Sequence, residues 1–169
     1  LRAISERQYV QLYRDDINEA IRRSLMEWAR IIRDGKRRSL MSATDDEVDG
    51  VLFTDGYSPE EITDDDKMRI GAVLFMKDRA KPVCFTMPIE KTIARKWLPR
   101  KNQIALVELF APIAAVETFG HLMQGKKIIF MIDSESALGA LVKGYSDRED
   151  MCELVGLFWK QIAQLDILT

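Results

Sequence analysis

The sequence predicts an α/β protein in which a mixed β-sheet is flanked by helices. Three apolar segments, at 51–55, 70–76 and 82–89, follow one another in the pattern of an antiparallel meander. A helical segment then precedes a fourth apolar strand at 128–133. A helix crossover after three antiparallel strands places the fourth strand parallel to one of them, and the natural arrangement sets it beside the first, through a right-handed connection. We expect helices to cover both faces of the resulting sheet.

A long amphipathic helix is expected over residues 5–33, ahead of the sheet. Its apolar residues recur at steps of three or four, the period of one helix face. They are Val10, Tyr13, Ile17, Ile21, Leu25, Trp28 and Ile32. A basic triplet at 36–38 and an acidic stretch at 42–50 follow. We therefore predict that residues 1–49 form a connector helix and linker, and that residues 50–169 form the main domain.

The helix between the third and fourth strands is predicted over about 106–123. Its sequence contains Pro112, which removes a hydrogen bond from a helix interior and clashes with the preceding turn. We therefore expect this helix either to start close to Glu108 or to be kinked there.

Two helices and the beginning of another strand are expected after residue 133. A short helix over about 135–143 is followed by a last helix, for which Ser146 and Glu149 form a capping box. The apolar pair at 167–168 resembles the start of a fifth strand that the chain does not complete. The first residue is leucine, so we expect the chain to be a piece excised from a longer polypeptide.

The composition excludes several classes of protein. The 169 residues are 47% apolar and 31% charged, and 25 basic residues balance 27 acidic ones, so a generally polycationic nucleic-acid binder is excluded. Cys84 and Cys152 lie in apolar sequence and are predicted to be buried thiols in a reducing compartment. His121 is the single histidine, which leaves almost no candidates for a zinc hydrolase or a histidine-based triad.

Two further observations indicate where the protein works. No apolar run approaches the ~18–20 residues needed to span a bilayer, so no membrane partner is expected. No secretory signal opens the chain. We therefore predict an intracellular protein, either cytoplasmic or nuclear.

Three carboxylates are the candidate chemical centre. Asp55 and Asp133 each end an apolar run, and parallel first and fourth strands would make them neighbours at one edge of the sheet. Glu108, near the start of the crossover helix, can reach the same edge. Three converging carboxylates repel one another unless a cation binds, and oxygen-only ligands suit two Mg²⁺ or Mn²⁺ ions. For either aspartate alone, a turn residue is the simpler interpretation.

A basic segment is the candidate for binding nucleic acid. It contains Lys91, Arg95, Lys96, Arg100 and Lys101, and Trp97 lies among them as a possible stacking face. A solvated loop with the tryptophan in the core explains the same pattern. Ser134 and Ser136 follow the second aspartate and could contact a phosphate or a sugar hydroxyl, although helix capping is the simpler role.

Several of these motifs, taken in order, resemble the ribonuclease H fold. They are Phe53-Thr54-Asp55-Gly56, the helix start Glu108-Leu109 with Ala111, and Ile132-Asp133-Ser134. More narrowly, the chain is similar to the ribonuclease H-like domain of retroelement reverse transcriptases, especially elements that carry a tyrosine recombinase and related protist copies. The helix with Trp28 and the basic turn at 36–38 occupy the place of the segment that precedes the first strand in those polyproteins.

The resemblance implies an endonuclease that hydrolyses the RNA strand of an RNA–DNA hybrid with two divalent metal ions. Asp55 matches the aspartate that binds both metals, Glu108 the helix glutamate on the leaving-group side, and Asp133 the aspartate on the attacking-water side. The partners implied are the hybrid and an upstream reverse transcriptase domain of the same polyprotein. The family's further carboxylate, after the fifth strand, has no good match in Asp166.

A second hypothesis of another class remains open. The domain would keep the fold but act as a structural or nucleic-acid-binding platform within a polymerase polyprotein. The incomplete fifth strand and the missing fourth carboxylate favour this alternative. The three retained carboxylates oppose it, because an idle cluster of like charges has a repulsion cost.

Overall fold

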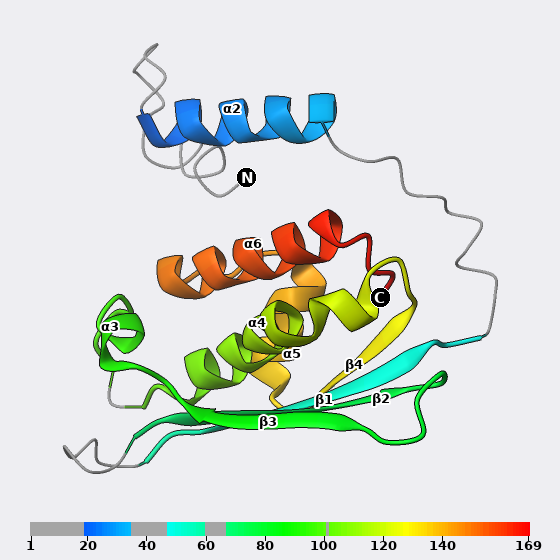
Figure 1. Ribbon diagram of the computed structural model, residues 1–169. Coiled ribbons are helices and arrows are strands. Elements are labelled where there is room, and N and C mark those ends of the chain that lie inside the picture. Colours follow the sequence, from blue (N-terminus) through cyan, green and yellow to red (C-terminus); the bar gives the residue numbers. More distant parts are fainter. Residues whose placement is uncertain (1–18, 35–46, 60–66, 101) are drawn as a thin grey trace. The chain divides into compact units, whose positions relative to one another are not determined.

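A computed structural model describes residues 19–34, 47–59, 67–100 and 102–169 (Figure 1). The chain divides into two compact units, residues 1–44 and 45–169, and each is described by itself. In the first unit, helix α2 (Glu19–Asp34) confirms the described part of the predicted long helix. The apolar residues Leu25, Trp28 and Ile32 are exposed on it. The rest of that prediction, the basic triplet and most of the acidic linker lie outside the described residues.

The second unit is an α/β structure built on a mixed sheet of four strands. The strands are β1 (Gly50–Tyr57), β2 (Arg69–Met76), β3 (Val83–Pro88) and β4 (Ile128–Ile132), and their order in the sheet is β3-β2-β1-β4. The first three strands are antiparallel, and β4 runs parallel to β1 with Thr54 opposite Ile132. The predicted mixed sheet and the pairing of its first and fourth strands are confirmed.

The connection from β3 to β4 consists of a short helix, α3 (Lys91–Ala94), and a long one, α4 (Ile104–Met123). Two further helices follow β4, namely α5 (Glu135–Lys143) and α6 (Glu149–Gln164). Helix α4 contacts β1, β2 and β4 on one side and α5 and α6 on the other, so it forms the centre of the core. Its own side chains are buried around most of its circumference.

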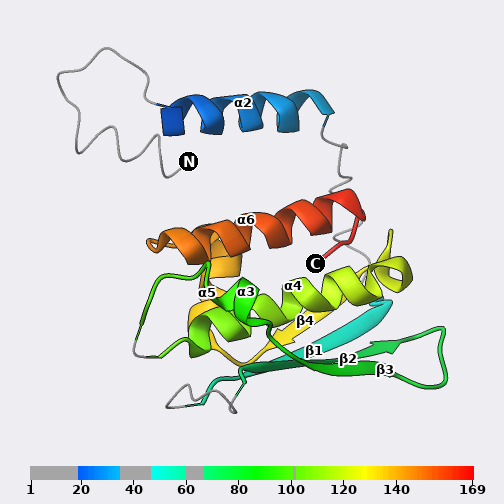
Figure 2. The same cartoon turned by 60° about the vertical axis from the view of Figure 1, so that its left-hand side comes forward.

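The helices of residues 45–169 lie on one face of the sheet (Figures 1 and 2). Alternation along β1 shows the two faces: Leu52 and Thr54 are buried beneath the helices, whereas Phe53 is 44% exposed. Phe75 and Met131 are similarly exposed on the neighbouring strands. The expectation that helices cover both faces is therefore wrong for the described part of this unit. The reason is that α5 and α6 pack against α4, on the same side of the sheet, and not against the opposite face.

Helix α4 (Ile104–Met123) agrees closely with the helix predicted over about 106–123, and Pro112 lies well inside it. Of the two alternatives for the proline, a helix start close to Glu108 is therefore wrong. The proline is buried and the backbone on both sides of it is helical. The expectation that no segment approaches the length of a membrane span is wrong for the described residues, because α4 is long and apolar enough by composition to cross a membrane. Its packing between the sheet and α6 explains that composition as the core helix of the unit, because most of its residues are buried.

The ends of α5 and α6 differ in how well the sequence predicts them. Ser134 is the N-cap of α5 and accepts a hydrogen bond from the Ala137 N–H, and Gly144 ends the helix at a φ of 74°. The predicted capping box of α6 is wrong, because its N-cap is Arg148, whose N–H donates to the Ser146 hydroxyl. At the predicted start of a fifth strand, Leu168 forms a parallel bridge with Lys127.

The two cysteines are not buried as expected. Cys84 is exposed and Cys152 is half-buried, and both are free thiols. Cys84 is paired with Val73 in the β2–β3 register, so it lies on the open face of the sheet. Its apolar sequence surroundings therefore reflect an uncovered strand face and not the interior.

Candidate metal centre

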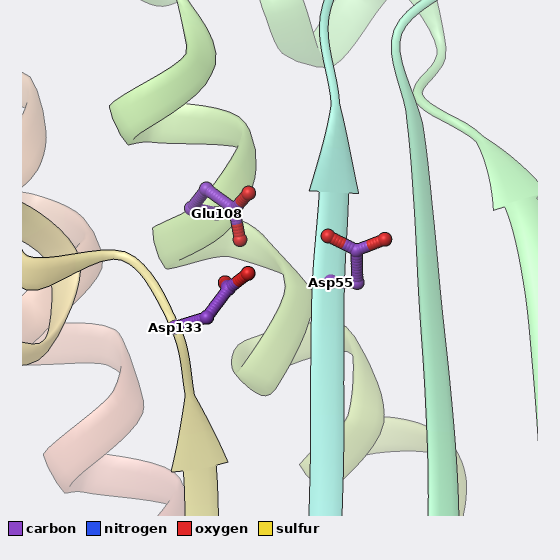
Figure 3. Close-up of side chains that lie close together, drawn as sticks. All are labelled: Asp55, Glu108 and Asp133. Carbon is purple, nitrogen blue, oxygen red and sulfur yellow. The ribbon is translucent and has the colours of Figure 1, made fainter.

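The three predicted carboxylates come together at the end of the parallel strand pair (Figure 3). Asp55 lies in β1, and Asp133 follows the last residue of β4. The parallel register places Thr54 opposite Ile132, so the next residue on each strand is an aspartate. Glu108 approaches from helix α4. One oxygen from each of the three side chains lies within 4.8 Å of the other two.

Glu108 is the buried member of the cluster. Its residue is 7% exposed, whereas Asp55 and Asp133 are exposed. The Oε2 atom of Glu108 is buried and has no hydrogen-bond partner among the described residues. A buried, unpartnered carboxylate oxygen is costly, and coordination to a cation would satisfy it.

The electrostatics of the cluster are dominated by this glutamate. Burial, followed by the negative charges of Asp133 and Asp55, raises the pKa of Glu108 to about 7. A hydrogen bond from the Gly56 backbone N–H to the carboxylate opposes part of that rise. At neutral pH the binding of a cation to this cluster would therefore release a proton from Glu108.

The donor set defines which ions fit. Three carboxylates at this spacing offer hard oxygen ligands and no nitrogen or sulfur, which favours Mg²⁺ or Mn²⁺ over zinc. Two of the carboxylates are open to solvent, so waters and a substrate oxygen can complete the coordination. The geometry therefore fits a catalytic cation site better than a closed structural one.

A hollow of about 540 Å³ on the open face of the sheet leads to the two exposed aspartates. Phe53, Val73 and Met131 line it, and Asp55 and Asp133 lie along it. The two aspartates are therefore accessible from the side of the sheet that the helices of this unit leave open.

The structure distributes the predicted basic segment among different roles. Lys91, Arg95 and Lys96 are exposed in and just after α3. Arg100 instead pairs with the buried Asp150 at the start of α6, and its side chain is 14% exposed. Lys101 lies outside the described residues. Three of the five predicted cations are thus presented to solvent.

Trp97 within this segment belongs to the core. It is 7% exposed, and its ring meets Phe110 of α4 edge-on, with 6.0 Å between the ring centroids. Trp97 was predicted either to offer a stacking face to nucleic acid or to lie in the core, and the structure supports the position in the core. The indole thus anchors the exposed cations of the segment against the helix that carries Glu108.

Ser134 and Ser136 lie directly after Asp133. The Ser134 hydroxyl caps α5, and its oxygen is 3.2 Å from that of Ser136. Capping, the simpler role for Ser134, is confirmed. Ser136 is exposed, and its binding of a phosphate or sugar remains a prediction.

Two residues that shape this region escaped the sequence analysis. Asp150 fixes the basic segment to α6, but nothing in the sequence connects it to Arg100, 50 positions away. Gly56 belongs to the motif at 53–56 without a role of its own in the sequence, and the structure places it inside β1, against the turn that carries Glu108. The available signal was its position directly after Asp55, since a glycine within a strand often marks a close backbone approach.

The fold and the cluster together define an α/β protein with a three-carboxylate site at the end of two parallel strands. No model of a known protein family matches the chain, and no curated protein matches it.

The raised pKa of Glu108 has a measurable consequence for the metal-free protein. Because its folded-state pKa of about 7 exceeds the usual 4.5, the folded state binds an extra proton between these values. Stability in EDTA is therefore expected to fall as the pH rises through this range, by on the order of 3 kcal/mol.

Thermal unfolding between pH 5 and pH 8 in EDTA would test this dependence. Glu108→Gln should flatten it and raise the melting temperature at the alkaline end. An unchanged slope in Glu108→Gln would mean that another group causes the dependence.

Proposed function

We propose that this protein is a ribonuclease H-type endonuclease that hydrolyses the RNA strand of an RNA–DNA hybrid with two Mg²⁺ or Mn²⁺ ions. The observation that carries the proposal is the convergence of Asp55, Glu108 and Asp133, with a buried and unpartnered Glu108 oxygen among them. The proposed biological setting is a retroelement reverse transcriptase, with an upstream polymerase domain in the same polyprotein.

The topology supports this proposal. A sheet of three antiparallel strands with β4 parallel to β1, crossed by a long helix, is compatible with the ribonuclease H-like fold. The sequence motifs that resemble this family fall on the matching elements: Asp55 on β1, Glu108 on the crossover helix and Asp133 after β4. The sequence motifs, the elements that carry them and the convergence of the three carboxylates together support the proposal more specifically than any one of these observations alone.

Two bound divalent cations would activate the attacking water and stabilise the leaving oxygen of a phosphodiester. The residues of the chain supply what that chemistry requires. Asp55 and Asp133 present negative oxygens at the open edge, where a phosphate can approach. Glu108, held by burial and by the Gly56 N–H, gives the third oxygen a fixed position.

The exposed cations of the α3 segment, Lys91, Arg95 and Lys96, are the proposed contacts to phosphates of the hybrid. Recognition of the RNA strand would depend on its 2′-hydroxyls and on the shape of the duplex, not on base sequence. Ser136, exposed beside Asp133, is a proposed contact to the sugar or phosphate next to the cut.

Cleavage of a labelled hybrid by the 169-residue chain tests the proposal. We expect the RNA strand to be cut into products with 3′-hydroxyl ends in Mg²⁺ or Mn²⁺, and cutting to stop in EDTA. A DNA duplex and an RNA duplex of the same sequence serve as controls and should remain intact.

The outcomes separate the two hypotheses. Metal-dependent cutting of the hybrid alone supports the nuclease. Binding of the hybrid without cutting in either metal would contradict it and favour the alternative of a ribonuclease H-fold binding platform. Cutting of duplex DNA would instead indicate a nuclease of another specificity.

A further inference from the structure

Helix α4 and strand β1 approach each other most closely at Gly56. A Cβ atom placed on this glycine would lie 2.9 Å from the backbone nitrogen of Glu108 and 2.9 Å from Cγ1 of Val107. The carbonyl carbon of Val107 would be 3.0 Å away. Two of these three neighbours are backbone atoms, which cannot move aside as the end of a flexible side chain can. Any side chain at position 56 must therefore displace the turn that carries Glu108.

The same glycine also touches the Glu108 side chain through its backbone. Its N–H donates a hydrogen bond to the Glu108 carboxylate. The neighbouring residue on the strand, Asp55, contributes a second oxygen to the cluster. Gly56 thus links strand β1 to the glutamate in two ways, by permitting the close approach and by supplying a donor.

The other glycines of the sheet show that this arrangement is particular to position 56. Gly50, at the opposite end of β1, is equally crowded, with the Met76 sulfur at 2.6 Å and the Phe75 carbonyl oxygen at 2.8 Å. Gly71 lies opposite Asp55 on β2, but its nearest neighbour is 3.6 Å away, an ordinary contact. Crowding and proximity to the carboxylates coincide at Gly56.

We propose that Gly56 is a positioning residue for the metal centre, which sets the distance and orientation of Glu108 relative to Asp55 and Asp133. This inference rests on the proposed function, because it assigns a role within the same cation site. Gly56 itself contributes no ligand atom. It acts through Glu108, by the backbone approach that only glycine allows and by the N–H that orients the carboxylate.

Mn²⁺ binding measured by isothermal titration calorimetry tests the proposal on the whole chain. Gly56→Ala is expected to weaken Mn²⁺ affinity by about 10- to 100-fold, the range found when an orienting partner of a ligand is removed. Gly50→Ala is the matched control, because it introduces similar crowding in the same strand away from the carboxylates. It should lower the melting temperature and leave Mn²⁺ affinity unchanged. Gly71→Ala should change neither the melting temperature nor the Mn²⁺ affinity.

A double-variant comparison distinguishes positioning from general damage. If Gly56 acts through Glu108, Gly56→Ala should add little further loss of Mn²⁺ affinity when Glu108→Gln is already present. Equal losses in both backgrounds would overturn the proposal.

A backbone variant covers the case in which Gly56→Ala does not fold. Glycolic acid at position 56 removes the N–H donor and adds no Cβ, and it should weaken Mn²⁺ affinity by about 10-fold. If the unsubstituted chain binds no Mn²⁺, the proposed function fails. If the chain binds Mn²⁺ and both changes at position 56 leave the affinity intact, only the inference about Gly56 fails.

Discussion

Replacing Asp55 by asparagine is expected to reduce cleavage of the RNA–DNA hybrid by roughly 10³-fold. The side chain keeps its shape but loses the negative charge that is proposed to hold both cations, and a bound cation stabilises the transition state by several kcal/mol. The measurement is the single-turnover rate of hybrid cleavage at saturating Mg²⁺ and again at saturating Mn²⁺. The loss should persist in both metals.

The same substitution should have the opposite effect on the metal-free fold. The charge of Asp55 is one cause of the raised pKa of Glu108, so its removal relieves repulsion within the cluster. In EDTA at pH 8, Asp55→Asn is therefore expected to melt at a higher temperature than the unsubstituted chain. A gain in stability together with a loss of activity is typical of a residue kept for function.

A matched control for Asp55→Asn is Asp78→Asn. Asp78 is exposed and pairs with Lys126 at the surface. It follows the end of β2 that pairs with Gly50, at the opposite end of β1 from Asp55. Asp78→Asn should leave cleavage unchanged and have little effect on stability, because an ion pair between exposed side chains is screened by solvent. Full cleavage by Asp55→Asn would show that the carboxylate cluster is not the catalytic site, whatever the other variants do.

The carboxylate cluster was predictable because its signal is local. Each aspartate directly follows an apolar run, and the strand register then needs only the parallel pairing of two strands to bring Asp55 and Asp133 together. A helix crossover is compatible with that parallel pairing, and the structure contains it. Glu108 required one further assumption, namely that the crossover helix passes the same edge of the sheet. The helix does so, and it begins at Ile104, close to the predicted start near residue 106.

The covering of the sheet was not predictable from the strands themselves. Continuous apolar runs such as the one at 51–53 are typical of strands buried on both faces. In the described part of residues 45–169, however, the odd-numbered positions of β1 face outward and Phe53 is 44% exposed. The apolar character of a run therefore does not show whether one face of its strand or both are covered.

Pro112 illustrates a different limit. Proline has no backbone N–H, so Pro112 cannot donate the helical hydrogen bond to the carbonyl of Glu108. A helix boundary was therefore the natural expectation. The helix continues because α4 is packed on both sides, against the sheet and against α6. Tertiary packing therefore outweighs a local penalty of about 3 kcal/mol.

The largest stability effect is expected at the Arg100–Asp150 ion pair. Asp150 is 5% exposed, and its carboxylate accepts hydrogen bonds from the Arg100 guanidinium and the Leu98 N–H. Arg100→Ala leaves this buried carboxylate without its counter-charge. We expect it to destabilise the fold by about 3–5 kcal/mol in chemical unfolding experiments at pH 7.

The pH dependence identifies the cause of that loss. Burial alone would raise the pKa of Asp150, but hydrogen bonds from Arg100 and from the Leu98 and Met151 N–H groups outweigh it and hold the pKa below its usual range. The depressed pKa means that the stabilisation is present above the unfolded-state value of about 3.9 and is lost as the pH falls below it. Arg100→Ala should therefore reduce the dependence of stability on pH in the acid range.

Activity measurements on the same variant separate the two roles considered for Arg100. If the residue is structural, Arg100→Ala should lower the melting temperature while the hybrid dissociation constant, measured well below that temperature, stays within about twofold. Lys96→Ala, which removes an exposed cation of the same segment, should do the reverse and weaken hybrid binding in a salt-dependent manner. Weaker hybrid binding by Arg100→Ala at unchanged stability would show that the arginine leaves Asp150 to contact phosphate.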